Sequence, residues 1–242
     1  MSEGPEVDRV PVEVAAADPP FRRRVLLAQP RPGIVEASIE DHIHHFSVVV
    51  THERGSVVAV EGDAIRAPWD LCPGAIEVLT DLVGSPIGVL PRVGDPSAHC
   101  THLLDVAATA IRFAGHSAVE RRIDLEVVGW ATPRSTARAV RHDGPALRWT
   151  VEGDLVVEPE PFTGRRLGRG FTDFVAGLDP ETAELALLLR RATRMCRSRS
   201  IDLDRFDVLA ESGLIPGSCF ASQPDRIGVA RRNRGSTLPE LR

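Results

Sequence analysis

Four short β-rich runs follow one another in the second half of the chain, and their succession constrains the fold more than any other feature. They cover residues 121–130, 136–142, 146–152 and 154–160. Turn-forming residues stand between them, including the pair Asp143-Gly144 and the glycine within 152–154. Short strands joined by such tight turns pair with their neighbours in opposite directions. The second half therefore predicts an antiparallel β-meander.

The first half has a different order, in which a β-hairpin precedes two helices. The runs 46–51 and 57–60 are rich in β-forming residues, and a glycine-containing turn joins them. Apolar residues then recur at helical spacing over 73–83, where Gly84 supplies the stop, and again over 103–114. Strands, helices, strands and a last helical part in this order predict an α+β fold.

The end of the chain adds a helix to the meander. Asp179 suits the N-cap position and Pro180 the first turn of a helix, whose apolar inner face continues to Cys196. Cys196 is therefore expected in the core. These patterns divide the chain into an extended lead-in over 1–20, a first half over 21–118 with regular structure from about Ile34, and a second half over 119–242 that packs with the first as one unit.

Composition excludes several classes of function. Of the 242 residues 43% are hydrophobic and 26% are charged, with a net charge of −5, as in ordinary globular proteins. This balance gives no reason to expect nucleic acid as a partner. No run approaches the ~18 consecutive apolar residues of a membrane span, and the acidic first residues do not resemble a signal peptide. We therefore expect a cytoplasmic protein whose four cysteines stay reduced and bind metals or act chemically.

Two of these cysteines mark the starts of predicted helices. Cys72 lies in the motif Pro-Trp-Asp-Leu-Cys-Pro-Gly-Ala, and Cys100 lies in His-Cys-Thr-His-Leu. The backbone N–H groups and the dipole at a helix N-terminus favour a thiolate. Two thiolates at helix starts on the same side of a sheet can share a metal ion, and zinc and iron accept both thiolate and imidazole ligands. Cys72 and Cys100 are thus predicted metal ligands.

The segment Glu-Asp-His-Ile-His-His at 40–45 offers further ligands directly before the hairpin. In an extended strand His42 and His44 project to one face, whereas Asp41 projects to the other. Glu40 and His42 are expected to join the two cysteines at the metal.

Residues around Cys100 are predicted to act on the substrate. His99 and His102 are suited to carry protons, and Asp105 completes the predicted catalytic group. Cys219 follows Gly-Ser at a point where the chain can bend. Its thiol is a candidate lid residue over a pocket formed by the first half.

The spacing of these motifs resembles a bacterial domain family of unknown function. The resemblance rests on Glu-Asp…His-Phe at 40–46, Arg-Ala-Pro-Trp…Cys-Pro-Gly-Ala at 66–75, Cys-Thr-His-Leu at 100–103 and Gly-Ser-Cys at 217–219. It covers almost the whole chain beyond residue 20. No activity comes with it, because none is assigned to that family.

Residues 34–115 are also distantly similar to the NifU-type iron–sulfur scaffold proteins. The likeness lies in a hairpin, a cysteine at a helix start, a glycine-terminated helix, a long loop and a His-Cys step that opens another helix. It implies a hairpin-plus-helices unit and a cysteine-bound iron–sulfur cluster. Glu40 and His42 stand in the region of the family's first thiolate, Pro73 replaces the small residue after its second cysteine, and Gly-Ser at 84–85 replaces its Gly-Lys pair. One thiolate fewer favours a catalytic mononuclear metal with an open position.

We therefore predict a metal-dependent enzyme that acts on a small organic molecule through zinc or iron. Two alternatives stay open. One is an iron–sulfur binding or delivery protein, and the other is a metal-free thiol enzyme with Cys100 or Cys72 as nucleophile and His102 or His42 as base. Nothing names the substrate, since Walker, GxGxxG and GxSxG motifs are lacking. The hairpin edge can pair with a second copy, so a homo-oligomer is compatible with the sequence.

Overall fold

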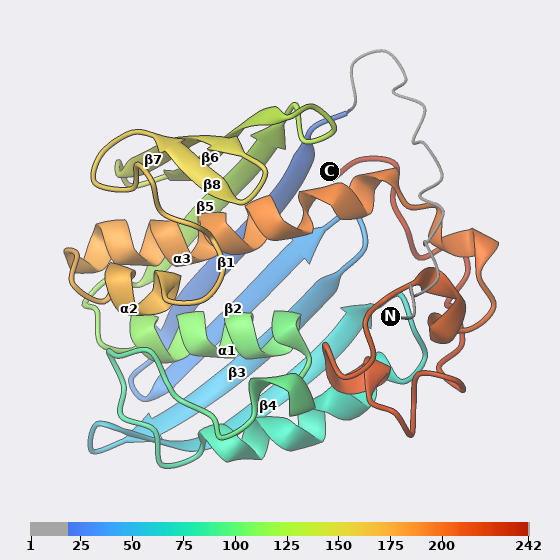
Figure 1. The fold of residues 1–242 in the computed structure, drawn as a ribbon. Helices are drawn as coiled ribbons and strands as arrows, with labels where there is room; N and C mark the ends of the chain where they lie inside the picture. Colours follow the sequence, from blue (N-terminus) through green and yellow to red (C-terminus); the bar gives the residue numbers. More distant parts are fainter. Residues whose placement is uncertain (1–18, 242) are drawn as a thin grey trace, which may run out of the picture.

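The chain folds around one eight-stranded antiparallel sheet. The computed structural model describes residues 19–241, in which the strands lie in the order β4-β3-β2-β1-β5-β6-β7-β8 (Figure 1). Their bounds are β1 (Phe21–Arg31), β2 (Ile34–Asp41), β3 (His45–Glu53), β4 (Ser56–Arg66), β5 (Glu120–Val128), β6 (Arg134–Arg141), β7 (Ala146–Glu152) and β8 (Leu155–Glu158). Two meanders therefore run outward from the central pair β1–β5, and the meander predicted for the second half is confirmed.

Helices cover one face of this sheet. α1 (Thr101–Phe113) packs on β2 and β3, and α3 (Pro180–Met195) packs on β5 and β6, both on the same face in Figure 1. The shorter segments are α2 (Phe171–Val175) and the 3₁₀ helices η1 (Cys72–Leu82), η2 (Pro96–Ala98), η3 (Cys196–Ser200), η4 (Leu203–Arg205), η5 (Leu209–Ser212) and η6 (Phe220–Ser222). The fold is therefore α+β, as predicted. None of the helices in residues 19–241 is long and apolar enough to cross a membrane.

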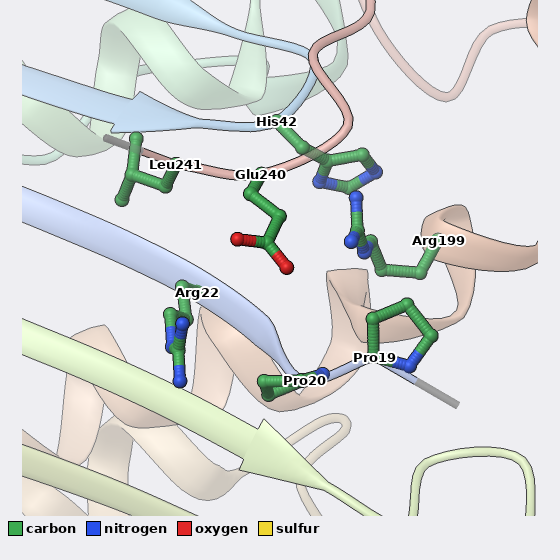
Figure 2. Close-up of a pocket in the computed structure, with 7 residues that line it drawn as sticks. All are labelled: Pro19, Pro20, Arg22, His42, Arg199, Glu240 and Leu241. Atoms are coloured by element: carbon green, nitrogen blue, oxygen red, sulfur yellow. The ribbon is translucent and has the colours of Figure 1, made fainter. Parts of the chain in front are cut away.

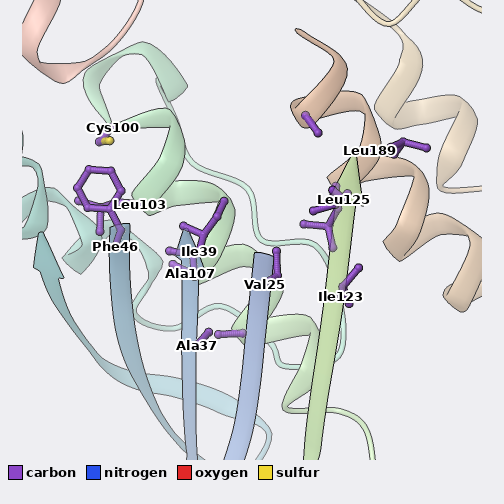
Figure 3. Close-up of a cluster of buried hydrophobic side chains, with 14 of the residues drawn as sticks. Val25, Ala37, Ile39, Phe46, Cys100, Leu103, Ala107, Ile123, Leu125 and Leu189 are labelled. Carbon is purple, nitrogen blue, oxygen red and sulfur yellow. The ribbon is translucent and has the colours of Figure 1, made fainter. Parts of the chain in front are cut away.

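The core lies between the helices and the sheet, because strand residues alternate between its two faces. In β1, Val25 is buried against the helices, whereas the neighbouring Leu26 is exposed on the other face. Figure 3 shows such core side chains, with Ile39 beneath α1 and Leu125 beside Leu189 of α3. Each aliphatic side chain buried in this way contributes about 1.5–3 kcal/mol.

Local signals predicted several boundaries correctly. The hairpin is formed by β3 and β4, and α1 ends close to the predicted position. The Asp179 side chain caps α3 by accepting the backbone N–H of Thr182 at 2.9 Å. The segment that begins at Cys72 is helical as predicted, but it is a 3₁₀ helix, and it ends before Gly84, whose φ is +86°.

β1 is the strand that the sequence reasoning missed, because regular structure was expected only from Ile34. The run of three arginines at 22–24 hides the alternation of β1, since Arg23 occupies an inward position where an apolar residue is usual. β1 pairs with both β2 and β5, so the boundary expected near residue 118 does not divide the sheet. Of the predicted lead-in, residues 1–18 lie outside the described part of the chain.

Candidate metal centre

A cluster of buried ionisable side chains lies at one end of the sheet, where β2 turns into β3 and α1 begins. Asp41 is the last residue of β2, His44 directly precedes β3, and His102 lies in the first turn of α1. All three are 7% exposed or less. Burial of three such groups together is unusual, because charged and polar side chains are costly to remove from water.

A tight turn places Asp41 and His44 on the same side of the chain. One carboxylate oxygen of Asp41 accepts the backbone N–H groups of Ile43 and His44, both at 2.8 Å. The backbone N–H of Asp41 in turn donates to the carbonyl of His44 at 2.8 Å. The expectation of an extended segment, with Asp41 and His44 on opposite faces, is therefore wrong. Aspartate commonly forms such a turn by bonding to the backbone two residues on.

Arg23 of β1 neutralises Asp41. Its Nη2 and Nε atoms donate to the other carboxylate oxygen at 2.6 and 3.2 Å, and both side chains are 1% exposed. Burial alone would raise the pKa of Asp41, but the neighbouring His44 and Arg23 outweigh burial and hold this pKa well below its usual range. Asp41 is thus a carboxylate within an almost fully buried ion pair.

The two histidines place their imidazole rings beside this carboxylate. Nδ1 of His44 lies 3.2 and 3.4 Å from the two oxygens of Asp41. The ring of His102 stacks on that of His44, with 3.7 Å between ring centroids and 22° between planes. Burial, followed by the charge of His44, holds the pKa of His102 well below its usual range. Nε2 of His102 is buried and has no hydrogen-bond partner, which leaves its lone pair or proton unused.

These three side chains form a set of metal donors. In the described part of the chain, only Asp41, His44 and His102 offer ligand atoms that all lie within 4.8 Å of one another. Two ligands of a tetrahedral ion with bonds of about 2.1 Å are ~3.4 Å apart, close to the distances between His44 Nδ1 and the carboxylate. Two histidines with one carboxylate are the donors of non-haem iron enzymes and of several zinc enzymes.

The predicted thiol ligands lie near one another but are not thiolates in this structure. The charges of Cys72, Cys100 and Cys219 act on one another, so the three thiols share one region. Burial is the largest influence on the pKa of both buried thiols. It raises the pKa of Cys100 to about 11, and it also raises the pKa of Cys72. The backbone N–H groups of Leu103 and His102 lower the pKa of Cys100 only in part. The expectation that the helix starts would favour thiolates is therefore corrected.

Phe220 brings the third thiol to the other two. Its backbone N–H donates to the carbonyl of His99, next to Cys100, at 3.0 Å. Its ring packs on Gly74, two residues after Cys72, so closely that a Cβ on Gly74 would lie 3.1 Å from the ring. Cys219, which precedes Phe220, is half-buried. It thus lies at the edge of the thiol group, and its role as a lid residue stays a prediction.

Glu40, His99 and Asp105, which were also predicted as site residues, each contact a different partner. Glu40 lies on the helix-free face of the sheet and accepts a hydrogen bond from Arg66 at 2.8 Å. His99 is buried, with Nε2 3.3 Å from a carboxylate oxygen of Asp81. Asp105 joins α1 to α3 by accepting a hydrogen bond from Arg191 at 3.0 Å. Of the residues chosen as ligands or catalytic groups, only His102 belongs to the Asp41 cluster.

His42 lies beside the centre without joining it. Its ring faces a crevice that also contains Arg199, and it packs edge-on against Phe21 at 5.6 Å. Burial lowers the pKa of His42 to about 4, so its ring is neutral at neutral pH.

The sequence reasoning missed Asp41, His44 and Arg23 as members of one site. Asp41 and His44 stand three residues apart in the segment singled out for ligands, and the turn signal Asp-x-x-His was present there. Arg23 carried no signal, because an arginine within a run of three is normally solvated.

Comparisons of the whole chain with known protein families, with curated proteins and with solved structures gave no match.

Proposed function

We propose that this chain is a metal-dependent enzyme that acts on a small organic molecule, with one zinc or iron ion held by Asp41, His44 and His102. The observation that carries the proposal is the convergence of one ligand atom from each of three buried side chains, together with Nε2 of His102, which is buried without a hydrogen-bond partner. An unpartnered buried polar atom is costly. A bound ion would remove that cost.

The proposed ligand set differs from the set expected from the sequence. It replaces Cys72, Cys100, Glu40 and His42 with a carboxylate and two imidazoles, and it keeps the zinc or iron. A three-ligand set leaves a position free for water or substrate. A bound ion of this kind supplies a polarised carbonyl or a water of lowered pKa.

The local charges favour an anionic fourth ligand. Asp41 and Arg23 cancel each other, and a buried divalent ion therefore adds two positive charges that this pair does not balance. Hydroxide or a substrate carboxylate would each reduce this excess. Arg23 also keeps Asp41 ionised and fixed in orientation, a role that outer partners commonly have at metal sites.

The experiment uses His102→Phe as its main variant. Phenylalanine keeps a ring against His44 and Phe46 and removes the nitrogen that has no partner. Protein purified without oxygen should contain about one zinc or iron per chain by elemental analysis. His102→Phe should lose this metal and keep its thermal stability without metal, whereas His142→Phe, on the helix-free face, should keep the metal. Full metal content in His102→Phe would refute the proposed site.

A second candidate, an iron–sulfur binding protein, is favoured by the three thiols that share one region. The resemblance of residues 34–115 to the NifU-type scaffold, an expectation from the sequence alone, would point the same way. If this candidate is correct, protein purified without oxygen should show visible absorbance. The absorbance should be lost in Cys72→Ser and in Cys100→Ser, and it should be kept in His102→Phe. A colourless preparation with one zinc or iron favours the first proposal instead.

A further inference from the structure

A small crevice lies at the same end of the molecule as the Asp41 cluster. The segment 238–241 passes over it and is tied down by two hydrogen bonds, from the backbone N–H of Leu238 to the carbonyl of His42 and from Arg199 to the carbonyl of Pro239, both at 2.7 Å. The crevice holds about 10 Å³, roughly the space of one water molecule. Its lining, shown in Figure 2, consists of Pro19, Pro20, Arg22, His42, Arg199, Glu240 and Leu241.

Two side chains present unused polar atoms to this crevice. His42 is 4% exposed, and neither of its ring nitrogens has a hydrogen-bond partner, although the backbone of Ser198 lies near the ring. Nε of Arg199 is likewise buried without a partner. Within the described residues, Arg199 makes no ion pair within 4.0 Å. Buried imidazole and guanidinium nitrogens normally have hydrogen-bond partners, and the partly exposed guanidinium group of Arg199 donates through Nη2 to the carbonyl of Pro239. An anion is the usual partner of a guanidinium group.

The carboxylate of Glu240 is the group in the structure that most resembles the missing partner. Figure 2 shows it projecting into the middle of the crevice, between Arg22 and Arg199. Its charge raises the pKa of Arg199, against the larger lowering by burial. The Glu240 carboxylate is too far from Arg199 to form an ion pair. It therefore leaves Nε of Arg199 without a partner. Arg22 is already paired with Glu126 at 2.9 Å on the rim.

We propose that this crevice binds a small carboxylate anion, held by Arg199 and His42, and that the side chain of Glu240 occupies the position of this anion when the anion is absent. A carboxylate accepts two hydrogen bonds from the fork of an arginine and a further one from an imidazole N–H. The space for one water is too small for such a ligand. The Glu240 side chain, which is on the exposed segment 238–241, must therefore swing out as the ligand enters.

This site is separate from the proposed metal centre and does not depend on a bound ion. His42 follows Asp41 in the chain, so a carboxylate anchored here would lie next to the centre. A substrate with a carboxylate group would thereby be positioned. The anion site can be tested in metal-free protein, and its failure would leave the metal proposal untouched.

The test is a calorimetric titration of the metal-free full chain with acetate and with succinate. In Glu240→Gln the competing charge is removed and the side-chain shape is kept, so carboxylate affinity should rise by about tenfold over the unsubstituted protein. Arg199→Gln should lose binding. Glu53→Gln, which removes an exposed carboxylate at the tip of the β3–β4 hairpin, should bind as the unsubstituted protein does.

Two controls keep this test open to refutation. Thermal unfolding of Arg199→Gln checks that the variant is folded, and the gain in Glu240→Gln provides a second readout that does not depend on Arg199→Gln. Unchanged or weaker binding in Glu240→Gln would overturn the proposal. Chloride or phosphate that binds as tightly as acetate, with no dependence on Arg199, would overturn it as well, because the site would then be a general region of positive charge.

Discussion

At the scale of single residues, the candidate centre combines one buried ion pair with a buried, uncharged imidazole. Asp41 is held by Arg23 and by the turn that leads to His44. His102 in the centre and His42 beside it are buried as uncharged rings, since burial lowers the pKa of both. Neutral imidazole is the form that binds metal ions. His102 is thus ready to bind a metal ion at neutral pH, and the protein must lose stability when acid forces protons onto His42 and His102.

This cost of protonation gives a pH dependence of stability. The pKa of His42 is about 4 in the folded protein and about 6.5 in an unfolded chain. Between these values the unfolded chain binds a proton that the folded protein does not, so the stability that His42 contributes is complete above pH 6.5 and declines as the pH falls to 4. The loss from this residue should approach about 3 kcal/mol.

Urea unfolding of metal-free protein between about pH 7 and pH 4.5 measures this loss. The free energy of unfolding should decline less steeply in His42→Gln than in the unsubstituted protein. His142→Gln, whose imidazole is exposed, serves as the control. An equally steep decline in His42→Gln would show that its protonation is not linked to folding.

At the scale of elements, four described helical segments begin at a cysteine: η3 starts with the core residue Cys196, and the other three start at the thiols that share one region. η1 starts with Cys72, Cys100 is the N-cap of α1, and Cys219 is the N-cap of η6. A helix start favours a thiolate only where solvent or a cation assists, and here burial opposes it. Cys72 and Cys100 are therefore suited to a soft metal ion that displaces their protons, and poorly suited to act as nucleophiles without one.

Alkylation rates test this assignment. In the metal-free protein Cys219 should react first with iodoacetamide, because it is half-buried and the other two are buried. Cys100, with a pKa of about 11 in place of about 9, should carry about 100-fold less thiolate and react correspondingly slowly. Mass spectrometry of the modified peptides measures the order, with urea-unfolded protein as the reference. Rapid modification of Cys100 in the folded protein would instead support the alternative of a metal-free thiol enzyme.

The elements that the sequence predicted are those whose signals are local. The hairpin β3–β4, the second meander and the cap of α3 at Asp179 all depend on turn residues and alternation within a few positions. β1 and the Asp41 cluster depend on partners far away in the chain. Arg23 can be recognised as buried only when Asp41 is placed beside it, and Asp41 reaches His44 only through a turn inside a segment that resembles an extended strand.

At the scale of the whole molecule, the two halves share one sheet and are also linked by an ion pair, in which Arg191 of α3 donates to Asp105 of α1 at 3.0 Å. Within the second half, Glu184 of α3 accepts two hydrogen bonds from Arg121 of β5 at 2.8 Å, and both of these side chains are buried. Removing one partner from such a buried pair commonly costs about 3–5 kcal/mol. Because β1 pairs with β5, neither half keeps its full sheet when the other unfolds. We therefore expect one cooperative unit.

Tryptophan fluorescence can report on the two halves separately. Trp69 belongs to the first half and Trp149 to the second, and both are buried. Variants that keep only one of them, with phenylalanine at the other tryptophan positions, should unfold in urea with the same m-value. Each variant should also show the same midpoint by fluorescence as by far-ultraviolet circular dichroism. Separate transitions for the two probes would show that the halves unfold independently.

The central pair β1–β5 also sets the order in which the molecule can be completed during synthesis. β1 is made at the start of the described chain, yet its partner at Glu120–Val128 leaves the ribosome about 100 residues later. Until then, one edge of β1 has no partner. Such edges invite pairing with other chains. Folding of this protein should therefore be most vulnerable to aggregation while β5 is still being synthesised, and a chaperone that shields strand edges would act in that interval.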